Sequence, residues 1–389
     1  MRAVQFDYAD PAFPASLVDL DEPTLPRGDW ARVEVTACGV CGSDLHLFSD
    51  NIGATPALVP LARAFPFVLG HEIAGRVIEA GPDCPVAVGT RVAVNPDLSC
   101  VARGIDPVCA ACAAGAESSC QNVDSEVLTP GMSLGMTSGL GGGWAEQVLA
   151  HSSMLHAVPD SVPERAASLH EPLSIAVHGL LRSPPEDGAP VLVVGGAIIG
   201  LATVAALRAL FPQCEVTVVA RHDRQAEAAG AVGAHRVVRS TDDFSHFAEL
   251  AEASGARVSG VGEQTMLIGG FPYVVDAVGY PGTVTEALRA VDNRGTVVLL
   301  GAASTVEVDL TPVWWKEAAL IGAVNHASDA GPGSTAHRHS IDRALEILGA
   351  GGLPPDAVIT HEFALDAYRD AIATALDRAA GAIKVVFRP

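Results

Sequence analysis

The sequence predicts an α/β plus β protein, with an irregular β domain first and a doubly wound parallel-sheet domain of the nucleotide-binding type second. The length of 389 residues exceeds what one compact core holds, so two domains are expected. Short extended segments punctuated by Gly and Pro fill the first part of the chain. Beyond about residue 190, apolar strands alternate with helical segments, which indicates a parallel sheet covered on both faces.

The first domain is expected over residues 1–159. Within it, residues 31–36 alternate between apolar and polar side chains, and residues 75–80 and 90–94 are extended in character. The Gly and Pro residues between these segments are typical of an irregular β structure.

The second domain is expected over residues 160–324. It opens with the strand PVLVVGG and the helical segment IIGLATVAALRAL, followed by the strand CEVTVVA, the short helix DRQAEAAGAVG and the strand HRVVRS. The segments FPYVVDAVG, TVTEALRAV and GTVVLLGA repeat the strand, helix, strand order, whereas the sequence leaves the structure of the Gly-rich segment 254–270 open. Residues 325–389, with a helix predicted at 365–380 and a strand at 383–387, are expected to return to the first domain.

The composition excludes several partners. The formal net charge of -21 opposes binding to nucleic acid or anionic lipid, which both need clustered Lys and Arg. The first residues, MRAVQFDYAD, lack the apolar core of a secretory signal, so a cytoplasmic protein is expected. Residues 188–207 are uncharged and long enough to span a bilayer, but Pro190 and the pair Gly195–Gly196 divide them into strand, turn and helix. No membrane association is therefore expected.

Cysteines concentrate in one segment of the chain. Of the eight present, Cys100, Cys109, Cys112 and Cys120 lie close together. In a cytoplasmic protein they are metal ligands or free thiols rather than disulfides. Four thiolates at short spacing match the tetrahedral site of a structural zinc ion. Incidental free thiols are the alternative, and the density of the cluster favours zinc.

Three short motifs supply the side chains of a catalytic metal site. CGVCGSDLH at 38–46 contains a thiol, a hydroxyl, a carboxylate and an imidazole, and LGHE at 69–72 and HEP at 170–172 each add an imidazole and a carboxylate. A catalytic zinc uses about three protein ligands and keeps one position open for water or substrate. Each motif alone is weak evidence, because a single Gly-His-Glu is more often a surface turn.

Together these motifs resemble the zinc-dependent medium-chain dehydrogenase/reductase family, most closely its sorbitol and threonine dehydrogenase branch. CGVCGSDLH, LGHEIAGRV, the cysteine-rich segment and EPLSIAVHG before a nucleotide-type fold follow the family's order over nearly the whole chain. The resemblance implies a GroES-like β-barrel catalytic domain and a Rossmann domain. It also implies a zinc-dependent alcohol dehydrogenase, in which the metal polarises the substrate oxygen and a hydride passes between a nicotinamide and an alcohol or carbonyl carbon.

The resemblance also implies roles for individual residues. Cys41 and His71 match the thiolate and imidazole zinc ligands, and Glu72 matches the carboxylate ligand of this branch. Glu171 matches a glutamate that lies near or on the metal. Ser43 and His46 match a proton relay. Asp44 matches a carboxylate that orients the imidazole of His71. Cys38 and His170 match no ligand position and are expected to be packed side chains.

The structural zinc segment departs from the family pattern. The family spacing is Cys-x2-Cys-x2-Cys-x7-Cys, whereas residues 101–108 separate Cys100 from Cys109. Asp106 occupies the position that the strict spacing gives and is the alternative first ligand. Cys100 is favoured, because zinc prefers thiolates in closed structural sites.

A glycine turn marks the expected cofactor site. The segment GGAIIG lies between a strand and a helix, where such a turn lets a pyrophosphate approach the helix N-terminus. Ala197 replaces the middle glycine of G-x-G-x-x-G, so its methyl group crowds that approach. The residues expected to contact the cofactor here are Gly195, Gly196, Ala197, Ile198, Ile199 and Gly200, together with Val278 and Gly301 at the ends of later strands.

The end of the next strand favours NADP(H) over NAD(H). That strand ends at Ala220 without the acidic residue that binds the ribose hydroxyls of NAD. Arg221, His222 and Arg224 follow, and the two arginines can grip a 2′-phosphate. A solvated turn of mixed charge is the alternative, and Asp223 could still serve a ribose.

The predicted function is hydride transfer between NADP(H) and a secondary alcohol, polyol or amino alcohol, with two zinc ions per chain. A zinc- and NADPH-dependent reductase of an activated alkene or imine is a rival, and a nucleotide-binding protein without turnover is a weaker one. The family suggests a homodimer or homotetramer. Candidates for the pocket lining, which sets the substrate, are Phe48, Trp144, Trp314 and Asn325.

Overall fold

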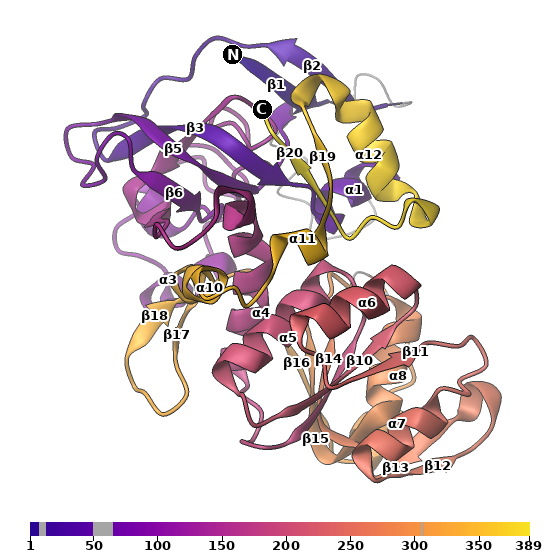
Figure 1. Ribbon diagram of the computed structural model, residues 1–389. Coiled ribbons are helices and arrows are strands. Elements are labelled where there is room, and N and C mark those ends of the chain that lie inside the picture. Colours follow the sequence, from indigo (N-terminus) through magenta and orange to yellow (C-terminus); the bar gives the residue numbers. More distant parts are fainter. Residues whose placement is uncertain (8–12, 50–64, 304, 306) are drawn as a thin grey trace.

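The computed structural model describes residues 1–7, 13–49, 65–303, 305 and 307–389 (Figure 1). Its largest parallel sheet has six strands in the order β11-β10-β9-β14-β15-β16. These strands are β9 (Pro190–Val194), β10 (Glu215–Ala220), β11 (Arg236–Arg239), β14 (Phe271–Asp276), β15 (Val291–Leu299) and β16 (Ala319–Gly322). All neighbouring pairs are parallel. The predicted Rossmann-type sheet is therefore confirmed.

The sheet is parallel because helices connect its strands. These helices are α5 (Ile198–Leu210), α6 (Asp223–Val232), α7 (Phe247–Ser254) and α8 (Pro281–Ala290), with the short α9 (Thr311–Trp315) before β16. Val191 to Val194 in the central strand β9 are at most 1% exposed, as expected for an apolar strand covered on both faces. The chain leaves β9 toward β10 on one side and later pairs β14 on the other. In open α/β sheets, such a switch point is where nucleotides bind.

The second body is a β barrel of GroES-like type that both ends of the chain help to build. A seven-stranded sheet contains β3 (Trp30–Gly39), β5 (Glu72–Ala80), β6 (Arg91–Val94), β7 (Gln147–His151), β8 (Leu155–Ala157), β19 (Ile359–Phe363) and β20 (Lys384–Phe387). A three-stranded sheet contains β1 (Arg2–Phe6), β2 (Ala15–Asp19) and β4 (Phe67–Val68). The tail strand β20 pairs with β3, and both termini lie on this body in Figure 1.

Helix α4 (His170–Arg182) lies between the two bodies (Figure 1). It packs against α5 and against α10 (Ser340–Gly349). Its first turn carries Glu171, so this junction brings that residue beside the barrel. The β17–β18 hairpin, made of β17 (Ser328–Ala330) and β18 (His337–His339), leads into α10.

The remaining elements are short. They are α1 (Gly42–Ser49), α2 (Cys100–Arg103), α3 (Ala110–Ala113), α11 (Pro355–Val358), α12 (Tyr368–Leu376) and the 3-10 turns η3 (Glu117–Ser119), η4 (Ser152–Met154), η5 (Glu164–Leu169), η6 (Gly262–Gln264), η7 (Leu365–Ala367) and η8 (Arg378–Ala380). No helix in the described part of the chain is long and apolar enough to cross a bilayer. The uncharged stretch 188–207 forms β9 and most of α5.

One local prediction differs from the structure, and one segment that the sequence left open forms a hairpin. The helix predicted at 365–380 is three pieces, because the chain turns extended at Asp377, whose carboxylate accepts a hydrogen bond from the backbone N–H of Ala379. Residues 254–270 contain an antiparallel hairpin of β12 (Arg257–Ser259) and β13 (Met266–Ile268). Its strands have three residues each, too short for an alternating pattern to stand out.

Candidate catalytic site, cysteine lobe and cofactor edge

The structure brings Cys41, His71 and Glu72 together. Their ligand atoms all lie within 4.8 Å of one another. The pairing of β3 with β5 explains the convergence, because it sets Gly39 opposite Glu72 and so places the turn after β3 beside the start of β5. A thiolate, an imidazole and a carboxylate at this separation fit a zinc ion of catalytic type.

The surroundings of His71 fit a metal ligand. Its Nδ1 lies 3.3 Å from Oδ1 of buried Asp44, and its Nε2 lies 3.4 Å from the Ser43 hydroxyl. Burial alone would lower the pKa of His71, but Asp44 and Cys41 outweigh it and raise that pKa. Asp44 is itself held by the backbone N–H of Cys41, at 2.9 Å. Asp44 therefore fixes the ring so that Nε2 faces Cys41 and Ser43.

Glu72 has a partner that the sequence did not reveal. Lys384 Nζ lies 2.7 Å from Oε1 and 2.8 Å from Oε2 of Glu72, and both side chains are buried. Burial raises the pKa of Glu72 while Lys384 opposes that rise. Lys384 stands in the predicted tail strand, and only the pairing of β20 with β3 shows where it points. Each carboxylate oxygen has two lone pairs, so Glu72 can accept from Lys384 and still bind a metal.

Glu171 is buried beside the cluster and lies outside the three-residue group. Its Oε1 lies 3.4 Å from His326 Nε2, and its Oε2 has no hydrogen-bond partner among the described residues. Burial raises the pKa of Glu171. A buried, unpaired carboxylate oxygen at this place suits a bound metal or its water. Sequence reasoning missed His326, which the return of the chain after β16 places here.

The other predicted residues are placed as follows. His170 is fully packed, with Nδ1 2.8 Å from the carbonyl oxygen of Ala167 and Nε2 3.3 Å from that of Val94, so it is not free to bind a metal. His46 lies on α1, one turn after Ser43, and is half-buried. Cys38 is buried in the barrel core.

The cysteine lobe, residues 97–131, holds the second group. The sulfur atoms of Cys100, Cys109, Cys112 and Cys120 lie within 4.8 Å of one another. Asp106 is exposed and is not part of this group, which agrees with the prediction of Cys100 as the first ligand. Backbone N–H groups of Cys112 and Gln121 point at Cys109 Sγ, at 3.5 and 3.4 Å. These hydrogen bonds lower the Cys109 pKa to about 6.

The glycine turn after β9 has the geometry of a pyrophosphate-binding loop. Gly195 has a φ of 110°, which favours glycine, and α5 begins at Ile198. A Cβ at Gly200 would lie 1.8 Å from the carbonyl oxygen of Gly195, so the helix packs this close only with glycine. Ala197 is exposed at the helix N-cap, with its methyl group on the surface of the turn.

Val278 and Gly301 complete the same edge of the sheet. A Cβ on Gly195 would lie 2.4 Å from Val278 Cγ2, and one on Gly301 would lie 2.1 Å from the Val278 carbonyl carbon. The loops after β9, β14 and β15 therefore meet at the switch point.

The loop after β10 carries the predicted basic residues, and all of them are exposed: Arg221, His222 and Arg224. Arg221 pairs with Asp242 at 3.0 Å. Sequence reasoning missed Arg239, at the end of neighbouring β11, which donates to the Arg221 carbonyl oxygen at 2.6 Å and pairs with Asp223 at 3.0 Å. The parallel register that sets Ala220 opposite Arg239 could have pointed to it.

Three of the candidates for the pocket lining are placed as follows. Trp144 is fully buried and packs on Phe387 in the barrel, with ring centroids 4.8 Å apart. Trp314 is 71% exposed on α9, beside the edge strand β16. Trp144 therefore contributes to the barrel core and Trp314 lies on an outer surface, and a place for either side chain in the substrate pocket stays a prediction. Phe48 packs in an aromatic cluster with Phe6 and Phe13.

Comparisons with known proteins agree with this geometry. The family models described as "Alcohol dehydrogenase GroES-like domain" and "Zinc-binding dehydrogenase" match residues 27–160 and 199–332. The chain is 29% identical to L-idonate 5-dehydrogenase of Vitis vinifera over 370 residues, covering 94% of this chain and 89% of that enzyme. It is 28% identical to L-threonine 3-dehydrogenase of Pyrococcus abyssi over 389 residues, covering 97% and 96%.

A solved structure shares the whole fold. A zinc-binding dehydrogenase of Sinorhizobium meliloti 1021, determined with NADP bound, superposes with a TM-score of 0.76 at 28% identity, covering 100% of this chain and 99% of that one. The chain therefore belongs to the zinc-dependent medium-chain dehydrogenase/reductase family, in its sorbitol and threonine dehydrogenase branch. It is a zinc-type alcohol dehydrogenase, an oxidoreductase acting on CH–OH groups.

Proposed function

We propose that this enzyme transfers a hydride between NADP(H) and a secondary alcohol, polyol or amino alcohol, using a zinc ion held by Cys41, His71 and Glu72. The observation that carries the proposal is the convergence of these three ligand groups within 4.8 Å. Zinc bound there would supply a Lewis acid for the substrate oxygen, opposite a nicotinamide that exchanges the hydride. A second zinc in the four-cysteine lobe would be structural.

The protein side chains divide the remaining work. Ser43, 3.4 Å from His71 Nε2, is placed to take the proton of the substrate hydroxyl, and His46 on the same helix to pass it outward. Asp44 keeps His71 in one orientation. Glu171 faces the same space from α4, where its unpaired Oε2 can hold a water or become a further ligand. Lys384 pairs with the buried Glu72 carboxylate and favours its ionised form.

The preference for NADP(H) rests on Arg221, Arg224 and Arg239. Asp242 and Asp223, the carboxylate partners of Arg221 and Arg239, are solvent-exposed, so a 2′-phosphate can replace those ion pairs at little cost. Arg239→Ala should lower kcat/KM for NADP by roughly ten- to hundredfold and leave NAD unchanged, as expected for a charge-assisted hydrogen bond. Arg236→Ala, at the other end of β11, is the matched control. An equal loss of kcat/KM with NADP and NAD in Arg239→Ala would contradict the proposed preference for NADP(H).

A turnover screen tests the proposed reaction. Secondary alcohols and polyols with NADP, and ketones, activated alkenes and imines with NADPH, are assayed with and without a zinc chelator. Chelator-sensitive turnover of the alcohols and ketones is the expected result. Turnover of the alkene or imine alone would support the rival reductase. No turnover of any of these substrates would contradict the proposed reaction.

We further propose a homodimer or homotetramer in the cytoplasm, with domain limits at 1–159, 160–324 and 325–389. The edge strand β16 and the neighbouring exposed Trp314 and Trp315 support self-association, because an open strand edge with apolar flanks pairs readily. None of the eight cysteines forms a disulfide in the described residues, which agrees with a reducing compartment. Sedimentation of the purified protein measures the oligomeric state.

A further inference from the structure

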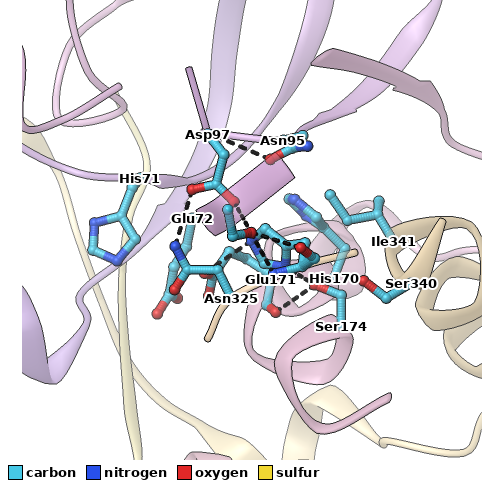
Figure 2. Close-up of polar contacts among 12 residues, drawn as sticks. His71, Glu72, Asn95, Asp97, His170, Glu171, Ser174, Asn325, Ser340 and Ile341 are labelled. Carbon is cyan, nitrogen blue, oxygen red and sulfur yellow. Dashed lines mark hydrogen bonds and ion pairs between the residues drawn. The ribbon is translucent and has the colours of Figure 1, made fainter. Parts of the chain in front are cut away.

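A buried carboxylate that neither zinc group uses lies beside the catalytic cluster. Asp97 follows β6, whose Val94 pairs with Ile73 of β5, so the loop 95–97 runs alongside the start of β5 where His71 and Glu72 lie. The Asp97 side chain is nearly inaccessible, and the residue is 3% exposed. Figure 2 shows the Asp97–Asn325 pair between His71 and Glu171.

The donors that reach this carboxylate are neutral. Asn325 Nδ2 donates to Oδ1 at 2.9 Å, and the Ser118 hydroxyl lies 2.5 Å from Oδ2. No Lys or Arg of the described residues forms an ion pair with Asp97. A buried charge without a cation is unfavourable in the folded protein, so such a group points to a role in binding.

The hydrogen-bond count leaves Asp97 short of donors. Ser118 accepts the backbone N–H of His326 at 2.9 Å, and its single proton is shared between Asp97 Oδ2 and the carbonyl oxygen of His326, which is 2.6 Å away. An ionised carboxylate can accept about four hydrogen bonds. Asp97 therefore has free acceptor capacity beside the ligand cluster.

Asn325 is held in place at some conformational cost. Its φ is 45°, in the left-handed region that most residues other than glycine avoid. It stands where the chain returns from β16 toward the barrel, and it is partly exposed while its amide donates to Asp97. Strain of this kind concentrates at functional sites, and here it aims an amide at a carboxylate.

We propose that Asp97 is a specificity-determining residue, which accepts a hydrogen bond from a hydroxyl on the carbon next to the reacting carbinol, with Asn325 as its positioning residue. The inference rests on the proposed function and narrows its substrate to alcohols with a neighbouring neutral donor, such as vicinal diols. The charge of Asp97 repels substrates with a carboxylate or phosphate at that position.

The test compares alcohols with the same reacting group. The stereoisomers of butane-2,3-diol, the enantiomers of butan-2-ol and those of 3-hydroxybutanoate are assayed separately with wild type and Asp97→Asn. The wild type should prefer the best diol over butan-2-ol by roughly ten- to hundredfold in kcat/KM, the range for a hydrogen bond to a charged group. It should use 3-hydroxybutanoate least.

Asp97→Asn removes the charge and keeps the neighbouring contacts, because its amide can donate to Ser118 and its oxygen can accept from Asn325. It should lower the diol to butan-2-ol ratio of kcat/KM at least about fivefold and raise the relative use of 3-hydroxybutanoate. Asp329→Asn is the matched control, since Asp329 pairs with His178 at 2.8 Å outside this loop. It should leave every ratio unchanged.

The outcomes separate the inference from the proposed function. An unchanged ratio in Asp97→Asn, or equal losses for all alcohols with a lowered Tm, would overturn the specificity role and leave the dehydrogenase intact. A wild type that prefers butan-2-ol or 3-hydroxybutanoate to every diol would overturn it as well. A wild type without turnover of any alcohol or ketone would refute both.

Discussion

The two metal-ligand groups are built in opposite ways. The lobe gathers Cys100, Cys109, Cys112 and Cys120 from one segment, and backbone N–H groups of that same segment point at its sulfur atoms. The catalytic group draws Cys41 from the turn after β3 and the pair His71–Glu72 from the start of β5. Lys384 and Glu171 come from parts of the chain far from both.

The difference shows what each site depends on. The lobe's ligands are close in sequence, so a metal can organise it with little help from the rest of the fold. The catalytic group exists only once β3, β5 and β20 are paired, because that pairing sets the positions of its thiol, imidazole and ammonium groups. Loss of a lobe ligand should therefore reduce stability first, and loss of a catalytic ligand should reduce activity first.

The largest expected effect is on activity. His71→Ala should lower kcat/KM by about 10³-fold or more, because the substrate oxygen loses its Lewis acid. With two zinc ions per chain in the wild type, as we propose, the zinc content of His71→Ala should fall to one ion per chain. Its Tm should change little. Turnover, metal analysis and thermal unfolding of the same preparation check this. A variant that keeps near wild-type turnover would contradict the assignment of His71 as a ligand of the catalytic metal.

The next effect concerns the buried Lys384–Glu72 pair. Lys384→Met leaves Glu72 buried without a cation, which costs about 3–5 kcal/mol in the free energy of unfolding. The cost should be smaller with zinc present, since the metal compensates the same carboxylate. Urea unfolding with and without zinc measures the difference, and Lys384→Met/Glu72→Gln should recover part of the loss. A cost independent of zinc would argue that Glu72 is not a ligand.

A smaller loss of stability is expected in the lobe. Cys112→Ser should remove one zinc per chain and lower the free energy of unfolding by about 3 kcal/mol, with kcat nearly unchanged at low temperature. The matched control is Cys84→Ser, which alters a thiol outside both groups. Unchanged stability after zinc loss would show that the lobe does not need its metal.

The sequence predicts features built from one segment better than features built from distant segments. The four cysteines, the glycine turn and the strand and helix alternation are local patterns, and the structure has them where they were expected. Lys384, His326 and Arg239 could not be assigned, because nothing near them in sequence reveals their partners. The choice between Cys100 and Asp106 also needed the path of the loop in space.

The smallest effect is a difference between two thiols of the zinc-free lobe. Hydrogen bonds from backbone N–H groups lower the Cys109 pKa to about 6, whereas burial raises the pKa of Cys112. A thiol reacts as its thiolate, and the lowered pKa keeps Cys109 largely in that form above about pH 6. Iodoacetamide should therefore modify Cys109 at pH 7, and the rate of modification should fall below pH 6. Mass spectrometry of chelated protein follows both sites. Zinc should protect both, and faster reaction of Cys112 would contradict the hydrogen-bond pattern.

Anomalous diffraction at the zinc absorption edge tests the central claim most directly. We predict two peaks per chain, one among the four lobe sulfur atoms and one roughly 2 Å from the Cys41 sulfur and the His71 imidazole. A crystal with full zinc in the lobe and no metal between Cys41 and His71 would contradict the account.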